Sequence, residues 1–122
     1  DALPICLIAA LTGGGVKKFF EKLLNKNKYK NVIYEVPGSA TKSGKPYIGR
    51  SNNFKRRMNE NTDGRDRTKA KIIGHYDSKK PKAGPIAEQN AMNQRGGVQH
   101  LDNKRNEIRP SDWSKYKVKP IK

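Results

Sequence analysis

The sequence predicts an α/β chain of the α+β kind: a small three-stranded antiparallel sheet flanked by helices over residues 31–122, preceded by an N-terminal extension over residues 1–30. Two observations support this prediction. Short segments rich in β-branched and aromatic residues alternate with Pro-Gly and Gly-Gly breaks, and helical patterns lie between them. The length of 122 residues fits one such domain and excludes a large single-core enzyme.

Three segments have the composition of strands. Val32–Val36 is rich in β-formers and ends at Pro37-Gly38, which is a turn signal. Lys45–Arg50 follows a second turn at Ser43-Gly44, so we expect the first two strands to form a hairpin with a loose loop. Lys69–Tyr76 is the third expected strand.

Two segments of the domain are expected to be helices. Ser51 to Asn53 supply N-cap residues for a short basic helix over Phe54–Met58. Pro85–Arg95 begins with proline in its first turn and stops at Gly96-Gly97. A final helical turn is expected over residues 111–116.

The N-terminal extension contains a basic amphipathic helix. Val16, Phe19, Phe20, Leu23 and Leu24 recur at helical spacing, which fits a helix that packs on the domain or one that lies on a membrane surface. The apolar run over residues 2–11 is shorter than the roughly 20 residues that span a bilayer, so we expect no stable membrane insertion. Because the chain starts with Asp, we expect it to be part of a longer protein.

The composition points to a polyanionic partner. The chain has 27 Lys and Arg against 11 Asp and Glu, a net charge of +16. Leu, Ile, Val and Phe supply only 23 of the 122 residues, a share at which such a charge favours disorder. Nucleic-acid phosphates are the most common source of compensating charge. The single Cys6 excludes an internal disulfide and fits a small buried hydrophobe.

Residues 32–58 carry a more specific pattern. Tyr34 ends the triplet Val-Ile-Tyr, Tyr47 begins the triplet Tyr-Ile-Gly, and Arg57 stands ten residues after Tyr47 on the following helix. This pattern resembles the GIY-YIG nuclease superfamily, as found in the C-terminal toxin domains of bacterial polymorphic (contact-dependent or Rhs-type) toxins. Val32 departs from it, since the family usually has Gly there. The resemblance extends over residues 31–109.

The resemblance implies a metal-dependent endonuclease. Glu88 matches the family's metal-binding Glu and would hold a single Mg²⁺ (or Mn²⁺) ion. Asn103, or in its place Asn106, matches a supporting Asn that forms neutral hydrogen bonds. The implied catalytic residues are Tyr34, Tyr47, Arg57, Glu88 and Asn103.

The same resemblance assigns roles to the tyrosines and the arginine. Arg57 would bind the scissile phosphate through paired guanidinium donors. Tyr34 or Tyr47 would orient or deprotonate the attacking water, and the resemblance does not decide between them. An unperturbed tyrosine has a pKa near 10. A base role therefore requires Arg50, Arg57 or the metal to lower that pKa.

Cationic side chains near these positions are the expected contacts to substrate. We expect a groove in which they bind backbone phosphates without reading bases, so cleavage would have little sequence specificity. The resemblance implies DNA as the substrate. His75 fits an ordinary strand-end residue better than an accessory base or a phosphate donor. The expected substrate-binding residues are Arg50, Lys55, Arg56, Lys69, Lys71, His75, Lys104 and Arg105.

The resemblance also implies a biological setting. The domain would be an antibacterial effector, secreted or delivered from the producing bacterium, that acts in the target-cell cytoplasm. An acidic immunity protein would neutralise it, because its surface would have to meet a charge of +16. Three alternatives stay open: an RNase of the same fold, a non-enzymatic basic nucleic-acid-binding protein, and a phage or mobile-element nuclease.

Overall fold

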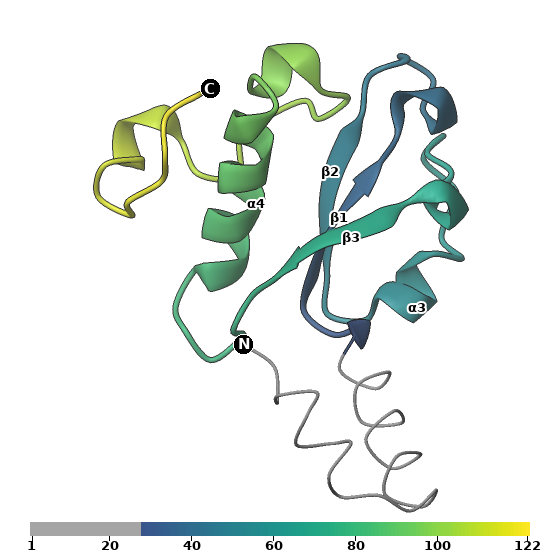
Figure 1. The fold of residues 1–122 in the computed structure, drawn as a ribbon, viewed down its shortest axis with the longest axis horizontal. Coiled ribbons are helices and arrows are strands. Elements are labelled where there is room, and N and C mark those ends of the chain that lie inside the picture. The colour runs from purple at the N-terminus through teal and green to yellow at the C-terminus, as the bar shows by residue number, and fades with distance from the viewer. Residues whose placement is uncertain (1–27) are drawn as a thin grey trace, which may run out of the picture.

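A computed structural model describes residues 28–122 of the chain (Figure 1). The expected amphipathic helix over residues 16–24, Cys6 and most of the 1–30 extension lie outside the described residues. Among residues 28–122, no helix is both long enough and apolar enough to cross a membrane.

The centre of the fold is an antiparallel sheet of three strands. β1 (Val32–Val36), β2 (Tyr47–Ser51) and β3 (Lys71–His75) lie in the order β2-β1-β3. β1 is therefore the central strand, and β2 and β3 are the two edges. The predicted fold class is confirmed: β1 has the predicted bounds, and the bounds of β2 and β3 shift by one to two residues.

The two predicted helices are also present. α3 (Phe54–Arg57) is a single turn whose N-cap, Asn53, accepts a hydrogen bond from the Arg56 backbone N–H at 3.1 Å. α4 (Ala83–Gln94) begins two residues before Pro85 and ends one residue before the predicted end. In place of the helical turn expected over residues 111–116, a short 3-10 turn covers Pro110–Asp112.

The helices pack on opposite faces of the sheet (Figure 1). On the α4 face, the core consists of Ile33, Ile48, Ala91, Met92 and Leu101. On the α3 face, it consists of Val32, Tyr34, Val36 and Phe54. Both apolar clusters are small, as the low content of Leu, Ile, Val and Phe requires.

Buried polar side chains supplement this thin core. The Gln89 side-chain carbonyl accepts hydrogen bonds from the backbone N–H groups of Glu107 at 2.7 Å and Ile108 at 3.0 Å. The Asn93 amide donates to the Lys119 carbonyl at 2.7 Å. Amides of α4 thus attach the irregular C-terminal segment by hydrogen bonds, in addition to the burial of Ile108 and Val118.

Candidate active site

The site lies around edge strand β2. Side chains alternate between the two faces of a strand, so Tyr47 and Gly49 share the face of Tyr34, while Ile48 and Arg50 share the face of α4. Side chains from both faces meet at this edge, where Arg50 pairs with a carboxylate of α4.

The two tyrosines lie together but differ in exposure. Their ring centroids are 6.3 Å apart; Tyr34 is fully buried, while Tyr47 is half-buried and lines a cleft. Tyr34 lies opposite Gly49 in the β1–β2 pairing, and a Cβ atom at Gly49 would overlap the Tyr34 ring and hydroxyl. The glycine of the Tyr-Ile-Gly triplet therefore makes room for the other tyrosine.

The structure brings Arg57 to Tyr34. The Arg57 Nε lies 3.5 Å from the Tyr34 hydroxyl, and its Nη1 donates to the Glu60 carboxylate at 2.7 Å. The side chain stays about one-third exposed, at 35%. Tyr34 is therefore a buried support for a guanidinium that solvent can still reach.

Sequence reasoning missed Arg67, which is the largest fully buried side chain of the described residues. Its Nε donates to the Tyr34 hydroxyl at 3.0 Å, and its two terminal nitrogens donate to the Asp63 carboxylate at 2.8 and 2.6 Å. The guanidinium of Arg67 holds the pKa of Asp63 well below its usual range. The four-residue spacing of Asp63 and Arg67 was the only signal in the sequence, and it indicates a local pair without identifying Tyr34 as a partner.

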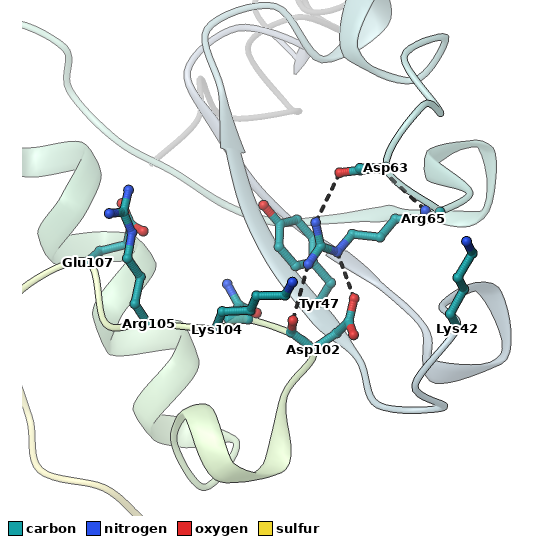
Figure 2. A pocket seen from close by; sticks show the side chains of 10 residues that line it. Lys42, Tyr47, Asp63, Arg65, Asp102, Lys104, Arg105 and Glu107 are labelled. Atoms are coloured by element: carbon teal, nitrogen blue, oxygen red, sulfur yellow. Dashed lines mark hydrogen bonds and ion pairs between the residues drawn. The ribbon is translucent and has the colours of Figure 1, made fainter.

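Tyr47 opens onto a cleft of about 660 Å³. Figure 2 shows the Arg65 guanidinium beside the Tyr47 ring, 3.9 Å from the ring centroid, with ion pairs to Asp102 at 2.7 Å and Asp63 at 3.0 Å. The residues that line the cleft are Lys42, Tyr47, Asp63, Gly64, Arg65, Asp102, Asn103, Lys104, Arg105 and Glu107.

The environment of Tyr47 corrects one expectation. Burial raises the pKa of Tyr47, the neighbouring Tyr34 raises it further, and the charge of Arg65 opposes this only in part. The lowering of this pKa that a base role needs from Arg50 or Arg57 is not found. The phenol stays protonated at neutral pH in the protein alone.

Glu88 lies on α4 at the other side of β2. It is 5% exposed, and Arg50 Nε lies 3.7 Å from its carboxylate. Burial, together with the charge of Glu107, raises the pKa of Glu88 to about 7, although Arg50 opposes the shift. Among the described residues, Arg50 Nη1 is buried with no hydrogen-bond partner. This pair is therefore incompletely satisfied.

Glu88 and Glu107 supply the hard oxygen donors that Mg²⁺ prefers. Residues 28–122 contain no group of three or more His, Cys, Asp or Glu side chains that could hold a metal ion. A cation at Glu88 would complete its coordination with water and substrate phosphate, which is the usual arrangement for Mg²⁺. The carboxylates thus fit Mg²⁺ as part of a coordination shell that water and phosphate would complete.

Asn103 and Asn106 occupy different places. The Asn103 side chain accepts a hydrogen bond from the Ile48 N–H at 2.9 Å and donates to the Ile48 carbonyl at 2.8 Å. It therefore pairs with β2 directly beside Tyr47. Asn106 accepts from Gln89 at 2.9 Å and thus supports α4.

The expected substrate-binding residues do not form one groove. Arg50 and Arg56, with Arg57, line a pocket of about 280 Å³ at the far end of β2, and Lys55 is exposed on α3 beside it. Lys104 and Arg105 line the Tyr47 cleft. These two groups flank the edge strand.

The structure does not bring the remaining expected cations together with these two groups. Lys69 and Lys71 line a separate recess beside Glu35. His75 lies at the end of β3, where its Nε2 is 3.0 Å from the Lys28 carbonyl. The reason is topological: β1 separates β3 from β2, so residues of β3 belong to the opposite edge of the sheet.

Comparisons of this chain with protein-family models, with curated proteins and with solved structures give no match. Its function is therefore inferred from its own residues and their geometry.

Proposed function

We propose that this chain is a metal-dependent endonuclease with a GIY-YIG-like site that hydrolyses phosphodiester bonds of DNA with little sequence specificity. One observation carries the proposal: Tyr34, Tyr47, Arg57 and Glu88, which are spread over 55 positions of the sequence, gather around one edge strand. A tyrosine pair, an accessible guanidinium and a buried carboxylate are suited to phosphodiester hydrolysis.

In this proposal, Arg57 binds the scissile phosphate and Tyr47 contacts the attacking water. Tyr34 is fully buried, so it acts by holding Arg57 rather than by touching substrate. Tyr47 reaches the cleft, and its raised pKa favours orienting the water through a hydrogen bond over removing its proton. Asn103 keeps this part of β2 in place.

Glu88 would hold the divalent cation, Mg²⁺ or Mn²⁺. When bound, such an ion disperses the charge of the phosphoryl oxygens and lowers the pKa of its bound water. Because the pKa of Glu88 is raised to about 7, the cation competes with a proton at neutral pH. We expect metal affinity to increase as the pH rises through 7, since ligands must be deprotonated to bind.

The proposal extends to the biological role. The domain would be an antibacterial toxin, delivered from the producing bacterium into the target-cell cytoplasm and neutralised by an acidic immunity protein. The net charge of +16 supports both a nucleic-acid substrate and an acidic inhibitor.

The decisive experiment incubates plasmid DNA and total RNA with the protein, with Mg²⁺ and with EDTA. Wild type should nick plasmid only with the metal, and Glu88→Gln should lose about 100-fold or more of that rate. Asp112→Asn is the control, because it removes the same charge from an exposed pair with Arg109.

The same assay separates the proposal from the RNase and from the non-enzymatic binder. Glu88→Gln cutting at the wild-type rate would show that the assigned site is wrong. Cleavage of RNA alone would favour the RNase. Binding of both nucleic acids without cleavage in any divalent metal would favour the non-enzymatic binder.

A further inference from the structure

The cleft beside Tyr47 contains two kinds of cation. Arg65 is neutralised there by the carboxylates of Asp63 and Asp102. In contrast, Lys42, Lys104 and Arg105 line the same cleft and form no ion pair among residues 28–122 (Figure 2). These last three side chains are exposed, so their charges remain available to a ligand.

The hydrocarbon stem of Lys42 lies beside Gly64. Gly64 has a φ of +84°, and a Cβ atom there would lie 2.9 Å from Lys42 Cε and 3.1 Å from its Cδ. The stem therefore packs against a glycine that no larger residue could replace without strain. Lys42 is exposed, so its ammonium group is open to the cleft that it lines.

The other two cations follow a segment that is anchored to β2. The Asp102 backbone N–H donates to the Pro46 carbonyl at 2.7 Å, and Asn103 forms its two hydrogen bonds with Ile48. Ser43 Oγ donates to Asp102 Oδ1 at 2.7 Å, which joins the segment carrying Lys42 to the one carrying Lys104 and Arg105. The two sides of the cleft are thus connected.

The cleft offers little aromatic surface. Among residues 28–122, Tyr47 is the only aromatic residue that lines it. Arg65 covers one side of its ring at 3.9 Å, and the Tyr34 ring lies 6.3 Å away. The cleft therefore gives a nucleic-acid base one partly covered ring, whereas three cations without an ion pair among the described residues suit phosphate groups.

We propose that Lys42, Lys104 and Arg105 form a binding site for backbone phosphates that adjoin the cleaved bond, with no contact to bases. This inference rests on the proposed function, because it takes nucleic acid as the ligand. It adds Lys42, which no sequence pattern indicated, and it excludes Lys69 and Lys71 of the separate recess.

The test measures binding without catalysis. A fluorescein-labelled DNA duplex is titrated with protein in EDTA at salt concentrations from about 50 to 200 mM, and fluorescence anisotropy gives the affinity at each. The double variant Lys42→Gln/Lys104→Gln is compared with Lys69→Gln/Lys71→Gln. Both remove two positive charges, and the second breaks only one long ion pair, between Lys71 and Glu35 at 3.9 Å.

The cleft variant should bind about tenfold more weakly and lower the slope of log affinity against log salt by about 2, since each phosphate contact contributes about 0.9. The recess variant should keep its slope and stay within about twofold of wild-type affinity. Duplexes of unrelated sequence should give the same values. Equal weakening by the two variants, or a marked preference for one sequence, would overturn the proposal.

Failure of this inference and failure of the proposed function are distinguishable. If the cleft variant alone loses affinity but wild type cuts nothing in any divalent metal, the phosphate site stands and the endonuclease does not. If wild type cuts plasmid while both variants bind alike, the endonuclease stands and this site is wrong.

Discussion

Two polar clusters flank strand β2, and they are built differently. The Arg67 cluster consists of Tyr34, Asp63 and Arg67, and its guanidinium donates to a phenol, a carboxylate and the Glu60 carbonyl at 2.6 to 3.0 Å. The Glu88 cluster consists of Arg50 and Glu88, which lie 3.7 Å apart, and Arg50 Nη1 has no partner among the described residues.

The difference separates a structural role from a chemical one. A buried polar group without a partner costs roughly 1–3 kcal/mol, so folds satisfy such groups wherever they only hold the structure together. The Arg67 cluster is satisfied and sets the geometry of the tyrosines. The Glu88 cluster is left incomplete, with a carboxyl pKa of about 7, and such incomplete sites favour ligand binding.

Breaking the Arg67 cluster should have the largest effect on stability. Arg67→Met removes the 3.0 Å donor to the Tyr34 hydroxyl and both Arg67 bonds to Asp63, which then keeps only Arg65. We therefore expect a loss of about 3 kcal/mol in the free energy of unfolding. Urea denaturation measures this. Arg109→Met is the matched control, because Arg109 is 77% exposed in its pair with Asp112 and its substitution should leave stability close to that of wild type. Equal losses in both variants would contradict a structural role specific to Arg67.

Gly49→Ala should disturb the tyrosine pair directly. The added methyl overlaps the Tyr34 ring, so we expect a cost of about 2 kcal/mol together with a loss of plasmid cleavage. Gly74→Ala on β3 is the control, since its nearest contact is Ile33 Cβ at 4.0 Å and both stability and cleavage should be retained. Thermal unfolding and cleavage assays compare the two. A tolerated Gly49→Ala would mean that Tyr34 can move without consequence.

Local patterns predicted the elements of this fold well. Val32–Val36 matches β1 in full, because β-formers bounded by Pro-Gly leave few other choices. The helix ends shifted by only a few residues, since caps and glycine stops are local signals. Tyr47 and Glu88 were selected by spacing and resemblance, and both lie at the edge of β2.

Long-range partners could not be predicted in this way. Arg67 contacts Tyr34 across 33 positions, and Arg65 contacts Asp102 across 37. No periodicity links such pairs. The grouping of Lys69, Lys71 and His75 with the site failed for a related reason, because the strand order β2-β1-β3 depends on packing rather than on any single segment.

The Glu88 cluster should lower stability as the pH rises. Because the folded-state pKa of Glu88 is about 7 and the unfolded value is about 4.5, the folded state holds the proton more tightly. Ionisation of Glu88 therefore lowers the free energy of unfolding as the pH rises from about 4.5 to about 7. Glu88→Gln should have the same free energy of unfolding as wild type near pH 4.5. At pH 8 its free energy of unfolding should be higher than that of wild type by on the order of 1–2 kcal/mol.

Urea denaturation near pH 4.5 and at pH 8 measures the difference in free energy of unfolding between Glu88→Gln and wild type. Asp112→Asn is again the control; Arg109 lowers the pKa of Asp112, so its substitution should bring no gain at high pH. A Glu88→Gln variant that is less stable than wild type at pH 8 would mean that the ion pair with Arg50 outweighs the burial of Glu88.

The smallest effect is expected at Asn103, where it should be confined to the edge of β2. Asn103→Ala removes both hydrogen bonds to Ile48, so we expect a global cost of about 1 kcal/mol and much faster hydrogen exchange at the Ile48 amide, which loses its acceptor. Asn106→Ala removes a comparable amide that bonds Gln89, and it should leave exchange at Ile48 unchanged. Amide exchange followed by NMR separates the two variants. If cleavage falls with Asn103→Ala and not with Asn106→Ala, the rigidity of the strand that carries Tyr47 is itself part of the site; equal exchange at Ile48 in both variants would show that β2 needs no such support.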